Sequence, residues 1–144
     1  MLQDFLIKQG YTKIKLHLTK TNHFEIIAKI NGVKGLFILD TGASNSCADV
    51  DTATMFKLNV KECDVKAAGA GATDMKTQTS EENKFTIGQW KKEKVVLVLF
   101  SLTHVNTALT NHNSRPVDGI IGADLLKKGK AIIDYQKKYL YLKL

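Results

Sequence analysis

The chain has 144 residues, of which 44% are hydrophobic and 24% are charged, so one globular domain with its own core is expected. The longest apolar run, residues 95–100, is far shorter than the roughly 20 residues that cross a bilayer, and the first residues do not resemble a signal peptide. The net charge of +7 comes from 20 Lys and one Arg scattered along the chain, which favours solvated lysines over a nucleic-acid interface. We therefore expect a soluble, cytoplasmic protein that binds neither nucleic acid nor a membrane.

Short alternating or apolar segments, separated by turn residues, predict a mainly β domain. In chain order the expected elements are a helix at 1–10, strands at 11–18, 23–31 and 34–39, a short strand at 47–50, a helix at 51–58, a strand at 60–67, a polar strand and its return at 76–87, a strand at 94–102, helices at 103–113 and 123–128, and a terminal hairpin of 131–134 with 138–144. Asn31-Gly32 is a strong hairpin signal between the second and third strands. Thr103 is the expected cap of its helix.

Residues 36–44, Leu-Phe-Ile-Leu-Asp-Thr-Gly-Ala-Ser, hold the clearest candidate for a catalytic group. The apolar run at their start predicts a strand buried on both faces, and Asp40 follows it at once. A carboxylate in such a place is costly unless it is hydrogen-bonded or shares a proton. Thr41 offers a hydroxyl that ties down the turn, and Gly42 permits close backbone approach. Asp-Thr-Gly alone more often marks only a turn after a strand, so the context has to decide.

A second motif lies late in the chain, at residues 117–126, Val-Asp-Gly-Ile-Ile-Gly-Ala-Asp-Leu-Leu. A strand followed by Asp-Thr-Gly-Ala-Ser, and later two apolar residues and a glycine before a short helix, together resemble a retropepsin-type, single-lobe aspartic protease. The resemblance covers about residues 24–144 and implies a closed β-barrel, the acid-protease lobe, with one or two short helices. Residues 1–144 then form a single domain, in which residues 1–20 are an N-terminal extension of a helix and a strand.

This resemblance implies an aspartic-type endopeptidase, a hydrolase whose substrates are peptides or proteins. Such chemistry needs two carboxylates around one water molecule, and the chain has a single Asp-Thr-Gly. A homodimer that brings together Asp40 from each subunit is therefore implied. In the family pattern, Asp40 is the shared-proton acid and base, and Thr41 locks the two turns across the dimer. Gly42 shapes the turn, and Ala43 lines the site near the bound peptide.

Other implied site residues lie in two further segments. The Gly-rich residues 67–72 resemble the flap that closes over substrate in this family, and a plain flexible loop is the alternative interpretation. The flap residues implied to lie against substrate are Gly69, Ala70 and Gly71. The residues implied to support the active turn by packing are Ile120, Ile121 and Gly122. Asp124 stands where the family usually carries a basic residue, which departs from the ion pair that usually supports the dimer.

Other kinds of site are not indicated by the sequence. Cys47 and Cys63 lack metal-type spacing, so two reduced thiols are the preferred interpretation and a disulfide is the alternative. The four His residues are scattered, and neither a metal nor a cofactor is expected. The competing function is a non-catalytic, retropepsin-like module that binds peptides or mediates dimerisation and keeps Asp-Thr-Gly only structurally. The last strand, at 138–144, is expected either to add to a dimer sheet or to be an ordinary edge strand.

Overall fold

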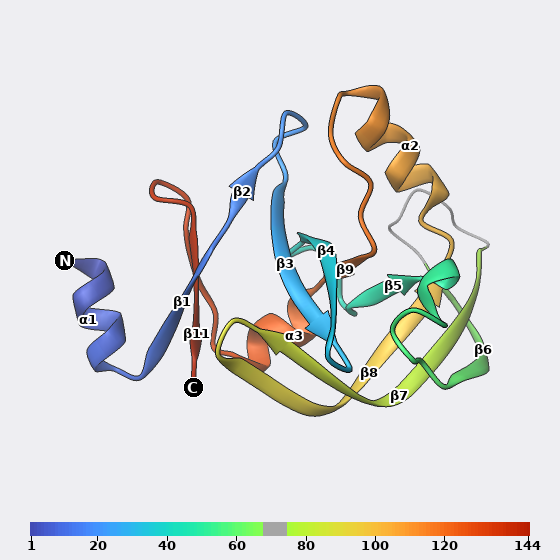
Figure 1. Ribbon diagram of the computed structural model, residues 1–144, viewed down its shortest axis with the longest axis horizontal. Coiled ribbons are helices and arrows are strands. Elements are labelled where there is room, and N and C mark those ends of the chain that lie inside the picture. Colours follow the sequence, from blue (N-terminus) through green and yellow to red (C-terminus); the bar gives the residue numbers. More distant parts are fainter. Residues whose placement is uncertain (68–74) are drawn as a thin grey trace.

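The computed structural model describes the backbone of residues 1–67 and 75–144 and the side chains of residues 1–62 and 77–144 (Figure 1). In chain order its elements are α1 (Leu2–Lys8), β1 (Tyr11–Lys15), β2 (His17–Leu18), β3 (Phe24–Ile30), β4 (Val33–Leu39), β5 (Cys47–Asp49), a 3-10 turn (Val50–Thr52), β6 (Val60–Ala67), β7 (Met75–Ile87), β8 (Trp90–Phe100), α2 (Thr103–Asn111), β9 (Gly119–Ile121), α3 (Ala123–Lys128), β10 (Ile132–Asp134) and β11 (Tyr139–Lys143). The expected mainly β class with short helices is confirmed.

The strands of the main sheet close into a barrel, as expected for an acid-protease lobe. Hydrogen bonding runs in the order β2-β3-β4-β9-β5-β8-β7-β6, and β3 also pairs with β7 through Lys29 with Thr86 and Ile30 with Phe85. Six of the described strands, from β3 around to β7, therefore form a closed ring, and β2 and β6 extend beyond it. Figure 1 shows the long strands β7 and β8 passing below the central strands. Closure leaves few unpaired strand edges in the lobe that carries Asp40.

Three buried phenylalanines fill the barrel around one glycine. The ring centroid of Phe37 lies 5.5 Å from that of Phe85 and 6.1 Å from that of Phe56, and all three side chains are buried. A Cβ atom on Gly35 would lie 2.6 Å from the ring of Phe56. Glycine at this position of β4 therefore lets the Phe56 ring enter the core, where apolar burial stabilises the fold.

The predicted helix at residues 51–58 is wrong. The chain makes only the 3-10 turn at Val50–Thr52 and then irregular turns. The backbone N–H of Phe56 donates to the carbonyl of Thr52 at 2.9 Å, but Lys57 has a φ of 57°, which stops helical progress. Placing Phe56 in the core outweighs the local helix pattern of this Thr-containing segment.

Residues 76–87 form one strand rather than a strand and its return, so that prediction is also wrong. β7 is unbroken and pairs with β8 from Gln78 to Ile87. The pairing register shifts between Ser80 and Phe85, where Glu82 has a φ of 61°. A bulge of this kind kinks a strand without ending it, and its polar residues resemble a turn in the sequence.

The two ends of the chain form a second sheet, with strand order β1-β11-β10. The predicted strand at 11–18 divides at Leu16, because β1 joins this sheet while β2 joins the barrel sheet. Leu16 is buried at the crossover and donates its N–H to the carbonyl of Lys138 at 2.9 Å. β11 lies between two strands of its own chain, so it is a central strand and not an edge strand to which a second copy can add.

Two smaller observations complete the fold. Leu102, not Thr103, is the N-cap of α2, and the Thr103 hydroxyl instead shares a hydrogen bond of 2.8 Å with the Ser101 hydroxyl.

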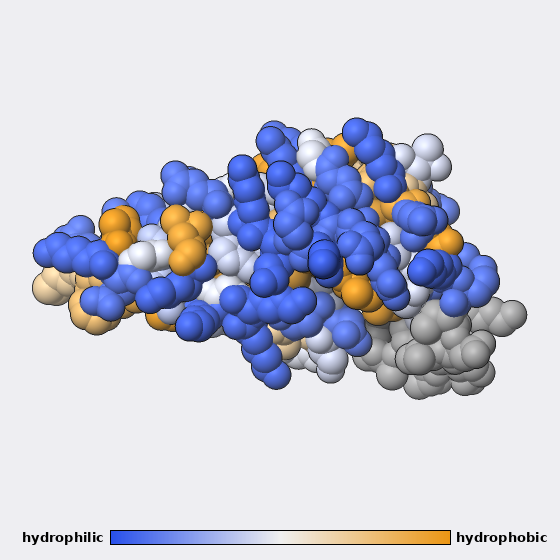
Figure 2. Space-filling model, turned by 90° about the horizontal axis from the view of Figure 1, so that it is seen from below, coloured by the Kyte–Doolittle hydropathy of each residue, from blue (hydrophilic) through white to orange (hydrophobic). Residues whose placement is uncertain are grey.

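In the part of the chain that the structure describes, no helix combines the length and hydropathy that a bilayer span requires. Figure 2 shows hydrophilic side chains over most of the face in view, in keeping with lysines distributed around the surface.

Candidate active site

Asp40 lies at the rim of the barrel, where β4 ends beside the parallel strand β9. Leu39 pairs with Ile121 as the last step of that pairing, and the Asp40 N–H then donates to the Ile121 carbonyl at 2.9 Å. The Gly42 N–H donates to Asp40 Oδ1 at 2.9 Å, and the Ala43 N–H donates to the Asp40 carbonyl at 3.2 Å. Two hydrogen bonds between backbone groups therefore fix the turn at the end of β4, and the bond from Gly42 orients the exposed carboxylate.

The late motif packs directly under this turn through Gly122. A Cβ atom on Gly122 would lie 2.7 Å from the Ala43 carbonyl oxygen and 3.0 Å from backbone atoms of Asn45. The next residue, Ala123, donates its N–H to the same Ala43 carbonyl at 2.7 Å. Because every close contact at Gly122 is with backbone, only glycine fits without displacing the turn that carries Asp40. The late motif thus fixes the position of that turn relative to the barrel.

Ser46 and Asp124 form a second link between the turn and the late motif, one that sequence reasoning missed. Asp124 Oδ1 accepts hydrogen bonds from both the Ser46 N–H, at 2.9 Å, and the Ser46 hydroxyl, at 2.7 Å. The Ser46 hydroxyl oxygen in turn accepts the Gly122 N–H at 2.9 Å. Ser46 is buried, and Asp124 lies in the first turn of α3, where a negative charge is favourable. Asp124 thus anchors the turn within its own chain.

A cleft of about 640 Å³ opens beside Asp40. Its lining residues come from the turn before β3, the ends of β4 and β9, and α2; they are Lys20, Thr21, Asn22, His23, Ile38, Asp40, Val105, Ala108, Leu109, His112 and Ile120. Clefts of this size hold ligands of the size of a short peptide. Among the described residues that line it, Asp40 is the single acid. The cleft therefore offers one carboxylate to a molecule bound along a wall of apolar, neutral polar and basic side chains.

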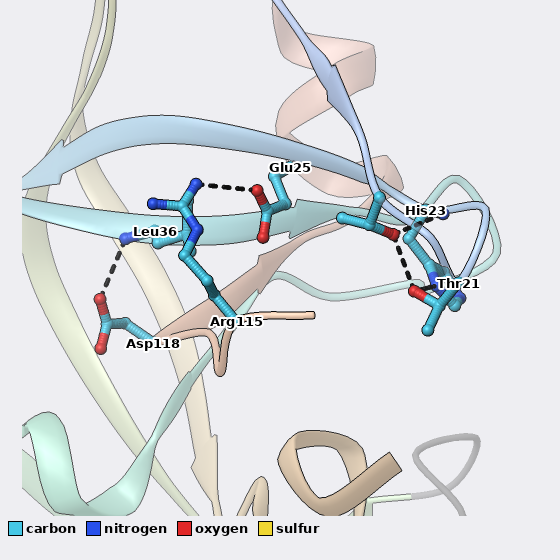
Figure 3. A network of polar contacts seen from close by, with 7 residues as sticks. Thr21, His23, Glu25, Leu36, Arg115 and Asp118 are labelled. Carbon is cyan, nitrogen blue, oxygen red and sulfur yellow. Dashed lines mark hydrogen bonds and ion pairs between the residues drawn. The ribbon is translucent and has the colours of Figure 1, made fainter. Parts of the chain in front are cut away.

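The wall made by α2 is tied to the strands by the segment that follows it. The side chain of Asn106 bridges this segment, donating to the Val117 carbonyl at 3.1 Å and accepting the Val117 N–H at 2.8 Å. Figure 3 shows Arg115 reaching Glu25 on β3, with 2.9 Å between Arg115 Nη2 and Glu25 Oε1, and Asp118 accepting the Leu36 N–H at 2.9 Å. These contacts hold one side of the cleft against the outer face of β3 and β4.

The ion pair of Glu25 and Arg115 is expected to stabilise this wall modestly. Glu25 is only 3% exposed but Arg115 is 67% exposed, so solvent screens the pair. A double-mutant cycle of Glu25→Gln and Arg115→Met should give a coupling free energy of about 1 kcal/mol in urea unfolding. The exposed pair of Lys61 and Glu81, 3.9 Å apart, serves as the control and should couple by much less. Equal coupling free energies in the two cycles would show that the burial of Glu25 does not strengthen its ion pair.

Cys47 lies behind the turn as a buried thiol and is free among the described side chains, which do not include that of Cys63. Burial raises its pKa from an ordinary 9.0 to about 12, and the nearby negative charges of Asp124, Asp40 and Asp49 also raise it. Because its thiol stays protonated up to strongly alkaline pH, it is a poor nucleophile at pH 8.

A labelling experiment checks this property of Cys47. In a Cys63→Ser variant, iodoacetamide at pH 8 should label Cys47 slowly in the native protein and rapidly once denaturant lowers the thiol pKa toward its ordinary value. Equal labelling rates with and without denaturant would show that the thiol is accessible and ionised in the folded state.

The remaining predicted site residues fall in different places. Thr41 is exposed on the far side of the turn and lines a separate hollow of about 280 Å³ with residues of α3 and β10. Ile120 and Ile121 are buried beneath Asp40. Gly69, Ala70 and Gly71, the predicted flap residues, lie outside the described residues. Within the described ranges, no cluster of three or more His, Cys, Asp or Glu residues is arranged to hold a metal ion.

Comparison with known proteins agrees with this geometry. The sequence model of the family described as aspartyl protease matches residues 26–125. A retropepsin-like aspartic protease from Rickettsia conorii has a similar structure, with a TM-score of 0.60 and 22% identity over 92% of this chain and 89% of that one. EIAV protease, solved with the inhibitor HBY-793, has a TM-score of 0.56 and 19% identity over 76% of this chain and 90% of that one.

A third similar structure is the retroviral protease-like domain of Ddi1 from Leishmania major, with a TM-score of 0.56 and 17% identity over 82% of this chain and 86% of that domain. No curated protein sequence matches the chain. At these identities the structural neighbours establish the fold, which is retropepsin-like. The family match covers more than half of the chain and includes both the Asp40 turn and Gly122. The chain therefore belongs to the aspartyl protease family.

Proposed function

We propose that this protein is an aspartic endopeptidase that hydrolyses peptide bonds as a homodimer, with Asp40 of each copy forming the catalytic pair. The observation that carries the proposal is the Asp40 turn, an exposed carboxylate held by backbone hydrogen bonds at the mouth of a cleft of about 640 Å³. Family membership supports the chemistry, and the exposed position of Thr41 supports a second copy facing the same turn.

The proposed reaction follows from two carboxylates that share one proton, the arrangement already described for aspartic proteases in general. The ionised carboxylate takes a proton from a water molecule, whose oxygen attacks the peptide carbonyl carbon. The protonated carboxyl of the other copy donates to the carbonyl oxygen. When the resulting tetrahedral species collapses, the carboxyl that took the proton from water donates it to the leaving nitrogen and the C–N bond breaks. A hydroxyl of the tetrahedral species returns a proton to the other carboxylate, so the pair again shares one proton.

The residues around Asp40 have supporting roles in this proposal. Gly42 keeps the turn tight and donates its N–H to Asp40 Oδ1. Ala43 would lie beside the substrate backbone. Thr41, on the exposed side of the turn, would contact the turn of the second copy. Gly69, Ala70 and Gly71 would cover the bound peptide. Packing and backbone contacts of Ile120, Ile121 and Gly122 would fix the position of the turn.

Cleavage of a mixed peptide library between pH 4 and pH 7, measured over a range of protein concentrations, tests this proposal. If two copies build the site, activity per mole of chain should rise with concentration and then level off as the dimer forms. A folded protein that cleaves nothing at any concentration would contradict the proposal and favour the non-catalytic peptide-binding or dimerisation module. Activity proportional to concentration for a proven monomer would contradict the homodimer.

A further inference from the structure

We infer that the cleft beside Asp40 selects peptides with an acidic side chain close to an apolar one. The apolar side chain would occupy the floor of the cleft, and the carboxylate of its neighbour would bind to the basic rim. This inference rests on the proposed function, because it names the class of substrate that the same site would take.

The floor of the cleft is apolar, and its side chains are buried or partly buried and packed against one another. Ile38 and Ile120 project from paired positions on β4 and β9, and both are buried. Leu109 of α2 is 3% exposed and packs with Ile38, and Val105 packs against the same cluster. An apolar side chain placed here would exchange water for aliphatic contacts, which is the main source of affinity in such clefts.

The rim is basic on two opposite sides. Lys20 and His23 come from the turn between β2 and β3, and His112 follows the last residue of α2. Phe24 pairs with Leu39, so His23 stands one step beyond, at the register position of Asp40. The three side chains are exposed, as groups that meet a ligand in solvent must be.

The turn that carries Lys20 and His23 is held in one shape by its own hydrogen bonds. The hydroxyls of Thr19 and Thr21 lie 2.7 Å apart, and the His23 N–H donates to Thr19 Oγ1 at 3.1 Å. The Thr21 hydroxyl oxygen lies 2.8 Å from His23 Nδ1 (Figure 3). When that hydroxyl donates to Nδ1, the neutral ring carries its proton on Nε2, which is then a donor for a carboxylate. Preorganisation of this kind lowers the entropy cost of binding.

Charge favours an acidic rather than a basic partner for this rim. Asp40 is the single acid among the described lining residues, against one Lys and two His. The chain as a whole carries a formal charge of +7, which attracts anionic peptides before contact. The cleft volume of about 640 Å³ accommodates more than one side chain, so an apolar side chain and a neighbouring carboxylate can be bound together.

The test compares peptide pairs that differ only by Glu or Gln next to the apolar residue that precedes the cleaved bond. At low salt, wild-type protein should cleave the Glu peptide with a kcat/KM about fivefold higher, and added salt should reduce this ratio. Lys20→Gln should move the ratio toward one. Lys29→Gln removes the same charge from the exposed surface of β3, outside the cleft, and should leave the ratio unchanged. Equal cleavage of both peptides, or the same change in both variants, would overturn the inference.

A binding measurement separates this inference from the proposed function. The Asp40→Asn protein, with fluorescently labelled Glu and Gln peptides, should bind the Glu peptide more tightly, and Lys20→Gln in that background should remove the difference. If this preference appears while wild-type protein cleaves neither peptide, the acidic selectivity stands and the protease proposal fails. If wild-type protein cleaves both peptides and the Asp40→Asn protein binds them equally, the protease proposal stands and the selectivity fails.

Discussion

Asp40→Asn is expected to lower kcat/KM for peptide cleavage by at least about 10³-fold, the scale of loss seen when a central catalytic group is removed. The substitution keeps the size of the side chain and its Oδ1 acceptor for the Gly42 N–H, which is 2.9 Å away. It removes the group that exchanges a proton with water, so the pair can no longer act as base and acid. Cleavage of a single peptide by wild-type and variant protein measures the loss.

Asp51→Asn is the matched control for this variant, because Asp51 is an exposed acid outside the cleft. It should cleave peptides within about twofold of wild-type protein, since surface changes away from a site have small effects. Thermal unfolding should show that the Asp40→Asn protein remains folded, because an exposed side chain contributes little to stability. A folded Asp40→Asn protein that retains wild-type activity would show that the chemistry lies elsewhere.

Asp124→Ala is expected to destabilise the protein by about 2 to 3 kcal/mol and to reduce any cleavage activity by about 10²-fold. Its carboxylate accepts two hydrogen bonds from Ser46, whose side chain is fully buried. Without the acceptor, two buried donors lose their partner, and each unsatisfied group costs about 1 to 3 kcal/mol. The Ser46 hydroxyl also accepts the Gly122 N–H, so the turn that carries Asp40 would shift relative to the late motif. Displacement of a catalytic group by about 1 Å is enough for a loss of this size.

The matched variant is Asp124→Asn, which keeps an oxygen acceptor for Ser46 and should lose much less stability and activity. Urea unfolding gives the free energy for each variant, and peptide cleavage gives kcat and KM separately. A positioning role predicts a lower kcat with little change in KM. An Asp124→Ala protein as stable and active as the wild type would show that the Ser46 link does not hold the turn.

The parts of the fold that could be predicted from sequence are those set by local chemistry. Asn31 and Gly32 have φ values of 52° and 84°, the left-handed pair that a tight hairpin turn requires, and Asn-Gly is the sequence that adopts it most readily. The apolar run of β4 had to be buried on both faces, and Asp40 had to follow at the rim. Two local rules thus located the candidate site before the barrel was known.

The parts that sequence reasoning missed depend on contacts between distant residues. Whether residues 51–58 form a helix depends on the core's need for Phe56 beside Gly35, which no local pattern contains. Ser46 and Asp124 are 78 positions apart, and neither is unusual in its own segment.

The same limit applies to the last strand and to the cleft. Leu140, Tyr141 and Leu142 of β11 are all buried, but the local sequence does not reveal that β1 and β10 occupy both edges of this strand. Lys20, His23 and His112 are scattered in the sequence and share a rim only because the turn before β3 faces α2. Residues that meet through tertiary structure alone are visible only once the topology is known.

The central claim, that two copies of Asp40 build one catalytic site, is tested most directly by mixing wild-type and Asp40→Asn chains. After unfolding and joint refolding of equal amounts at constant total concentration, peptide cleavage should fall to about one quarter of the wild-type value, because only dimers with two intact carboxylates are active. The fraction should follow the square of the wild-type share across mixing ratios. Activity that falls linearly, to about one half at equal amounts, would show that each chain carries a complete site and would contradict the shared pair.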